Sequence, residues 1–142
     1  MELDTNSKIN REIAKAIVSA QICSDGGKDI NTVATKNCFR GAHYMRYALK
    51  TTFILRAIKM IVHTKNEFSF FAKEEPDQNG YSSVLVYFEF RCNGTKHQIS
   101  FHSPRNKAAE LLPFCGKGRK THWNCARTSR ADAQLLAELF DL

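Results

Sequence analysis

The stretch YFEFRCNGTKHQISFHSP, Tyr87 to Pro104, carries the strongest structural signal in this sequence of 142 residues. Its centre is Asn93-Gly94, which lies between two runs in which apolar and polar residues alternate. An Asn-Gly pair favours a type I′ turn, because both central residues of that turn need positive φ angles. The stretch therefore predicts a β-hairpin whose two strands are joined by a two-residue turn.

The two-residue turn also predicts the register, from Cys92 opposite Thr95 to Leu85 opposite His102. Successive side chains of a strand point to opposite faces. One face is then apolar and should join the core: Val86, Phe88, Phe90, His97, Ile99 and Phe101. The other face is polar: Leu85, Tyr87, Glu89, Arg91, Lys96, Gln98, Ser100 and His102. The register thus separates two histidines, with His97 at the turn end of the core face and His102 on the polar face.

Helical periodicity precedes the hairpin in two segments. Apolar residues recur at helical spacing through residues 7–23, and Ser7 is suited to cap the start of that helix. A second helix is predicted from Ala42 to Val62, with Val62 on its apolar stripe and Lys50 outside it. The β-branched residues in the second half of this segment leave a strand as the alternative. A short strand at residues 68–70 and a loop at residues 74–80 should follow.

Two further helices are predicted after the hairpin. Ser103-Pro104 is typical of the first residues of a short helix, which Pro113 should end. Ser129, with Asp132 three residues later, resembles a capping box at the start of the last helix. The sequence therefore predicts one compact α+β domain over residues 1–142, with a small antiparallel sheet built around the hairpin and packed against N- and C-terminal helices.

The positive charge is unevenly distributed. The net charge of the chain is +7, and residues 103–130 hold +6 of it, because Glu110 is their only acid. The basic residues of this segment are Arg105, Lys107, Lys117, Arg119, Lys120, Arg127 and Arg130. Such a concentration indicates an anionic partner, either nucleic acid or an acidic protein surface.

The remaining composition indicates a cytoplasmic protein without a membrane segment. No apolar run of about 18 residues is present, and the first residues lack the apolar region of a secretory signal. The five cysteines are an odd number without close pairs, so free thiols are expected. Cys115, His122 and Cys125 lack the paired spacing of a zinc site, so no metal and no cofactor is predicted, although metal binding by these three stays open.

Three functions are compatible with these residues. The leading one is a module that binds nucleic acid or a nucleic-acid-processing complex. Its contacts would be made by Arg91, Lys96, Lys117, Arg119, Lys120 and Arg127. The second is a metal-independent endoribonuclease with His102 and His122 as acid–base catalysts. The third is an inhibitor that binds only protein. The sequence does not distinguish RNA from DNA and does not determine the oligomeric state.

Two segments resemble parts of small proteins carried by phages and mobile elements. They are HQISFHSP, residues 97–104, which follows the Asn-Gly turn, and HWNCARTSRADAQLLAEL, residues 122–139. The resemblance implies an antagonist of host defence, a class that includes anti-CRISPR inhibitors. Such inhibitors commonly occupy a nucleic-acid-binding surface or disable a guide complex. Because this chain is basic, the resemblance implies binding to RNA, to DNA or to an acidic patch of a target.

Overall fold

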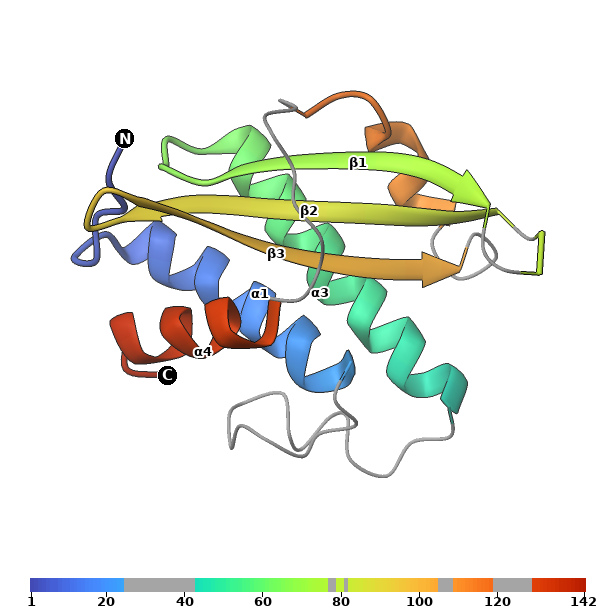
Figure 1. Cartoon of the computed structure of the whole chain (residues 1–142), viewed down its shortest axis with the longest axis horizontal. Coiled ribbons are helices and arrows are strands. Elements are labelled where there is room, and N and C mark those ends of the chain that lie inside the picture. The colour runs from blue at the N-terminus through green and yellow to red at the C-terminus, as the bar shows by residue number, and fades with distance from the viewer. Residues whose placement is uncertain (25–42, 77–78, 81, 105–108, 119–128) are drawn as a thin grey trace.

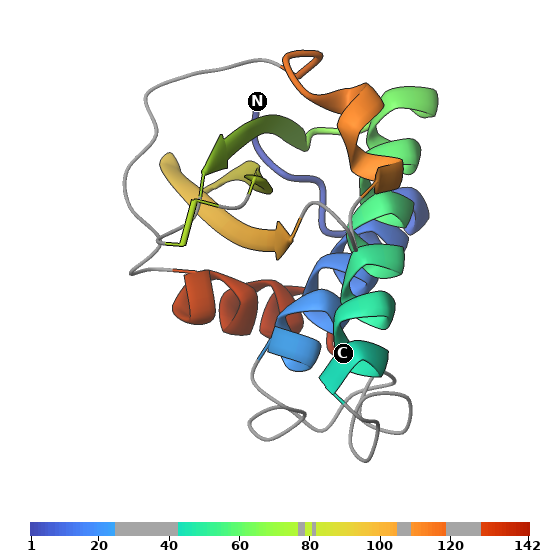
Figure 2. The same cartoon turned by 90° about the vertical axis from the view of Figure 1, so that its right-hand side faces the viewer.

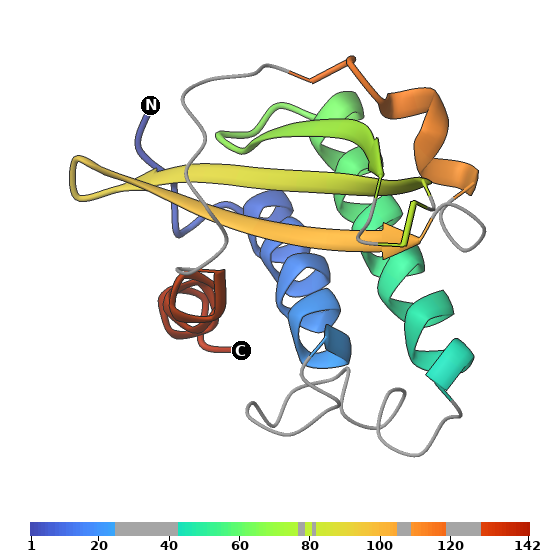
Figure 3. The same ribbon diagram turned by 45° about the vertical axis from the view of Figure 1, so that its right-hand side comes forward.

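Three antiparallel strands form the sheet, in the order β1 (Ser69–Pro76), β2 (Ser82–Cys92) and β3 (Thr95–Pro104). The computed structural model describes residues 1–24, 43–76, 79–80, 82–104, 109–118 and 129–142. Helices α1 (Lys8–Ser24) and α3 (His43–His63) cover one face of the sheet (Figures 1 and 2). Helix α4 (Ser129–Leu139), seen end-on in Figure 3, lies beside β3. The α+β fold predicted from the sequence is therefore confirmed.

The hairpin has the predicted turn and register. Asn93 and Gly94 have φ angles of 53° and 76°, as a type I′ turn requires. Cys92 pairs with Thr95, and the pairing continues without a shift to Leu85 opposite His102. The inner face is buried as expected, because Phe88 is fully buried and its ring lies edge-on to that of Phe101, with the centroids 6.0 Å apart.

Helix α1 is the centre of the helical layer. Most of its predicted apolar stripe is buried, with Ile13 and Ile17 fully inaccessible to solvent, while Ile9 is partly buried. Complete burial of such a side chain contributes about 1.5–3 kcal/mol relative to leaving it in water. The start of the helix is capped as predicted, because the Ser7 hydroxyl accepts a hydrogen bond of 3.1 Å from the Asn10 amide.

Helix α3 continues to His63, so the strand alternative for its second half is wrong. The buried side also differs from the prediction. Lys50, expected outside the stripe, is 8% exposed, and Val62, expected on it, is 50% exposed. The reason is tertiary: the residues that α3 buries against α1 and the sheet are centred on Ile54 and Ile58, which are fully buried.

Both edge strands run further than the sequence predicted. Residues 74–76 belong to β1 rather than to a loop, and Ser103 and Pro104 end β3 rather than begin a helix. Proline is tolerated in an edge strand, where its missing N–H need not pair with a neighbour. The short helix is a 3₁₀ helix, η1 (Ala109–Phe114), and Pro113 lies inside it rather than after it.

Helix α4 is attached to the open edge of β3 through its first turn. The Gln98 amide donates to the Asp132 carboxylate over 3.0 Å, and the Ser100 amide donates to the Ser129 hydroxyl over 2.9 Å. Asp132 also lies 2.9 Å from Nδ1 of His97, whose ring stacks on that of Phe90. The two residues predicted to cap α4 thus satisfy amides of an edge strand, which would otherwise be available to another strand.

The cysteines only partly fit the expectation of free thiols. Cys92 and Cys115 are free, whereas Cys23 takes part in a disulfide, so the expectation is wrong for Cys23. Because disulfides are rare in reducing compartments, the cysteines no longer support a cytoplasmic location. Cys38 and Cys125 lie outside the described residues. Within the described residues, no helix combines the length and apolar character needed to cross a bilayer.

Candidate functional site

Arg91 and Lys96 face each other near the hairpin turn, on the side of the sheet away from the helices. Two like charges at directly opposed positions repel. Lys96 is compensated, because its ammonium lies 3.8 Å from the carboxylate of Glu89, its diagonal neighbour on β2. Arg91 is exposed, and its guanidinium has no acidic partner among the residues that the structure describes. The hairpin end therefore presents one uncompensated cation beside a compensated one.

Glu89, which pairs with Lys96, is largely buried. The Glu89 residue is only 8% exposed, and its carboxylate accepts a hydrogen bond of 3.4 Å from the side-chain amide of Gln98. A carboxylate held in this way restricts the long Lys96 side chain that pairs with it. Arg91, in contrast, keeps its five N–H donors for another anion.

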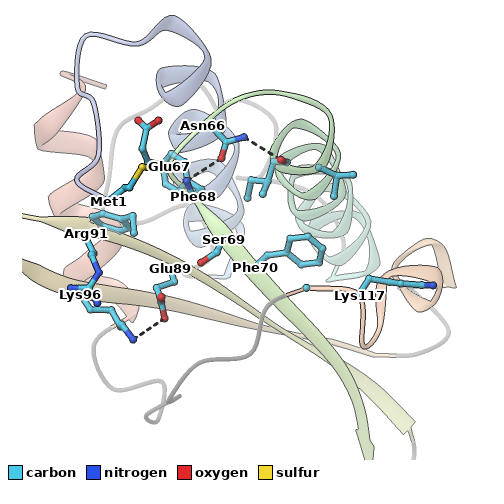
Figure 4. Close-up of a pocket in the computed structure, with 14 residues that line it drawn as sticks. Met1, Asn66, Glu67, Phe68, Ser69, Phe70, Glu89, Arg91, Lys96 and Lys117 are labelled. Atoms are coloured by element: carbon cyan, nitrogen blue, oxygen red, sulfur yellow. Dashed lines mark hydrogen bonds and ion pairs between the residues drawn. The ribbon is translucent and has the colours of Figure 1, made fainter.

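A cavity of about 550 Å³ lies next to these residues. Its walls come from the hairpin end, the start of β1, the end of α3, the first residue of the chain and the residues after η1 (Figure 4). The lining residues are Met1, Ile61, Val62, Asn66, Glu67, Phe68, Ser69, Phe70, Glu89, Phe90, Arg91, Lys96, Lys117 and Gly118. The volume is within the range of about 300–1,000 Å³ that is usual for ligand sites.

Lys117 borders the same cavity from the other side. Figure 4 shows its side chain opposite Arg91 and Lys96 and directed away from them. The backbone before it is fixed to β1, because the Gly116 amide donates to the Ala72 carbonyl over 2.8 Å. Gly118 then passes so close to β1 that a Cβ atom there would lie 1.9 Å from the Phe70 carbonyl oxygen.

The first residues of the chain are held at the opposite wall. The Leu3 amide donates to the Arg91 carbonyl over 2.8 Å, and the Gly94 amide donates to the Glu2 carboxylate over 3.0 Å. Glu67 accepts from the Asp4 amide and from the Asn10 side chain, over 3.1 and 2.7 Å. These contacts hold residues 2–4, and Met1, which precedes them, lines the cavity on the side of Arg91 in Figure 4.

Three of the six predicted contact residues therefore border one cavity: Arg91, Lys96 and Lys117. Arg119, Lys120 and Arg127 lie outside the described residues. The sequence did not indicate Met1 and Val62 as part of this cavity. Val62 was assigned to a buried stripe, and no local pattern brings the start of the chain to the hairpin.

His102 lies at the other end of the sheet. It is exposed on the predicted face, and its Nε2 is 2.8 Å from the Ser83 hydroxyl. That hydroxyl donates its only proton to the Glu75 carbonyl, so His102 Nε2 must donate to Ser83. Six residues of strand separate His102 from Lys96, or about 20 Å at 3.3 Å per residue. The described residues therefore give His102 no cation from the cavity, and His122 lies outside them.

The thiols and possible metal ligands form no chemical centre in the described part of the chain. Burial raises the pKa of the Cys115 thiol, and the nearby Glu74 carboxylate raises it further. A raised pKa keeps the thiol protonated at neutral pH, which makes it a weak nucleophile and metal ligand. The described residues contain no group of three or more His, Cys, Asp or Glu suited to a metal ion, and His122 and Cys125 lie outside them.

Comparisons with known proteins add nothing to the interpretation of this site. The chain matches no family model, no curated protein sequence and no solved structure.

Proposed function

We propose that this protein binds nucleic acid, either alone or within a nucleoprotein complex, through the cavity at the hairpin end of the sheet. The observation that carries the proposal is the uncompensated guanidinium of Arg91 beside Lys96, at the wall of a cavity of about 550 Å³. A guanidinium can donate two parallel hydrogen bonds to a phosphate, which makes arginine well suited to a nucleic-acid backbone.

The charge of the chain supports the same partner. An excess of +7 raises the rate at which polyanions encounter the molecule, and Lys117, which borders the cavity, belongs to the basic segment 103–130. Within this proposal, the resemblance to mobile-element proteins implies that the bound nucleic acid belongs to a host-defence complex. An acidic protein surface is the rival partner.

Charge reversal of Arg91 tests the proposal. Arg91→Glu would remove the free guanidinium and place a second carboxylate beside Lys96, so Kd for a labelled oligonucleotide should increase about tenfold at low salt. Fluorescence anisotropy with single- and double-stranded probes of one sequence measures the affinity. The same titrations test for cleavage. RNA probes recovered at full length would show that the protein does not cleave RNA under these conditions, contrary to the proposed roles of His102 and His122.

Lys8→Glu is the matched control, because it changes the charge by the same two units. Lys8 is exposed, does not line the cavity and lies in the first turn of α1, where a carboxylate is favourable. Equal losses in the two variants would mean that net charge, and not the cavity, determines binding. A lysate pull-down divided into nuclease-treated and untreated halves separates the rival, since a partner retained after nuclease treatment would be protein.

A further inference from the structure

The cavity at the hairpin end is not only cationic. Among the described residues, two large hydrophobic residues are strongly exposed to solvent: Met1, which is 86% exposed, and Val62, which is 50% exposed. Both line this cavity. Ile61, which is partly buried, lines it beside Val62. Exposed apolar side chains are common singly, but their convergence on one cavity indicates a ligand with an apolar part.

Cationic and apolar groups therefore line one cavity, but Ile61 and Val62 belong to the end of α3 and only Met1 lies on the side of the cations. Figure 4 shows Met1 and Arg91 on the same side of the cavity, with Lys96 next to Arg91. A ligand that contacts this wall would place an anionic group against the guanidinium and a flat or apolar group against the thioether of Met1. A nucleotide has both parts, since its phosphate is charged and its base has an apolar face.

The pairing state of the nucleic acid then matters. In a duplex, the base faces are stacked on each other, and only base edges and phosphates are open to a protein. Apolar side chains in a cavity can reach a base face only if the base is unstacked, as in single strands, loops and ends. A duplex would use Arg91 and Lys96 and leave the apolar wall in contact with water.

We infer that the cavity takes a short stretch of unpaired nucleotides, with phosphates at Arg91 and Lys96 and bases against the apolar part of the lining, which we call the apolar wall: Met1 on the side of Arg91, and Ile61 and Val62 at the end of α3. The inference rests on the proposed function and specifies its substrate class as single-stranded nucleic acid. Discrimination comes from the apolar wall, because the cations attract the phosphates of both single strands and duplexes.

The test compares three probes of equal length: a labelled 12-nucleotide single strand, its duplex, and a single strand with abasic positions throughout. The protein should bind the normal single strand more tightly than the other two. Val62→Ser removes apolar surface from the wall and leaves every charge in place. It should weaken binding of the normal single strand about fourfold, the equivalent of roughly one buried methylene, and leave binding of the abasic strand unchanged.

Two further variants keep the result interpretable. Val62→Thr replaces one methyl group with a hydroxyl at nearly constant shape, so it should reproduce part of the loss in a folded protein. Leu139→Ser makes the same type of change on α4, outside the cavity, and should leave the preference for the normal strand intact. Melting curves and circular dichroism of all variants identify any that do not fold.

The possible failures are distinguishable. If no probe binds, the proposed function itself is wrong. If the duplex or the abasic strand binds as tightly as the normal strand and Arg91→Glu still weakens binding, the protein binds nucleic acid but the inference is wrong. If an acidic dodecapeptide containing leucine displaces the single strand at lower concentration than unlabelled single strand does, the cavity is a peptide site and the inference is overturned.

Discussion

Gly118 shows how a single residue determines the shape of the cavity wall. A Cβ atom at this position would lie 1.9 Å from the Phe70 carbonyl oxygen and 2.7 Å from its carbon. Both are backbone atoms of a paired strand, so neither can rotate away. Only glycine allows the residues after η1 to pass this close to β1, and this approach brings Lys117 to the cavity.

Gly118→Ala should therefore destabilise the protein. The segment must move away from β1 to relieve the overlap, which should lower the free energy of unfolding by about 1–3 kcal/mol. Urea denaturation followed by circular dichroism measures the change. Lys117→Ala, at the neighbouring exposed position, is the control and should leave stability unchanged. A Gly118→Ala protein as stable as the parent would show that these residues do not pack against β1 as described.

At the scale of elements, α4 is joined to the sheet by polar contacts as well as by its buried leucine. Asp132 accepts a hydrogen bond from the Gln98 amide and contacts His97, while Leu136 is fully buried. The Asp132 carboxylate is partly buried and accepts from two donors. Its removal would leave both donors without an acceptor. The attachment of α4 to β3 should therefore depend strongly on Asp132.

Asp132→Ala should lower the free energy of unfolding by roughly 2–3 kcal/mol. The Gln98 amide should also exchange with solvent faster, because it loses its acceptor; nuclear magnetic resonance of the exchanging protein follows this amide individually. Glu138→Ala is the control, since Glu138 is an exposed acid on the same helix and its removal changes the charge equally. Unchanged exchange at Gln98 in Asp132→Ala would contradict the edge contact.

At the scale of the whole molecule, the dominant feature is the net charge of +7. Binding to a nucleic acid releases counterions. The logarithm of the binding constant should therefore fall linearly with the logarithm of the salt concentration. If Arg91 contacts one phosphate, Arg91→Glu should reduce the magnitude of that slope by roughly 0.7–0.9. Anisotropy titrations at several salt concentrations give the slopes, and Lys8→Glu should keep the parent slope. Affinity that does not change with salt would exclude a phosphate-binding surface.

The parts of this fold that were predictable from sequence are those with a local cause. Asn93-Gly94 and the alternation on either side determined the hairpin register, and Arg91 and Lys96 were placed opposite each other on that basis alone. Ser7 was identified as a helix cap from its position next to a periodic segment. In each case the interacting residues are close in the sequence or are related by one turn.

The remaining features depend on contacts between distant segments. Pro104 resembles the start of a helix, but its place on an edge strand removes the cost of its missing N–H. Val62 fits an apolar stripe, but the way in which α3 packs against α1 and the sheet leaves its side chain exposed to solvent. The cavity is lined by parts of the chain as far apart as Met1 and Lys117, and no local sequence pattern predicts that they lie close together.

The attachment of the chain start beside Arg91 has a practical consequence for purification. The Leu3 amide bonds to the Arg91 carbonyl and Met1 lines the cavity, so an affinity tag fused ahead of Met1 would emerge at the cavity wall. A polyhistidine tag there could block the entrance or itself bind nucleic acid. The last residue, Leu142, follows α4 on the helical side of the molecule (Figure 1). A C-terminal tag, or complete proteolytic removal of an N-terminal one, leaves the cavity free for binding assays.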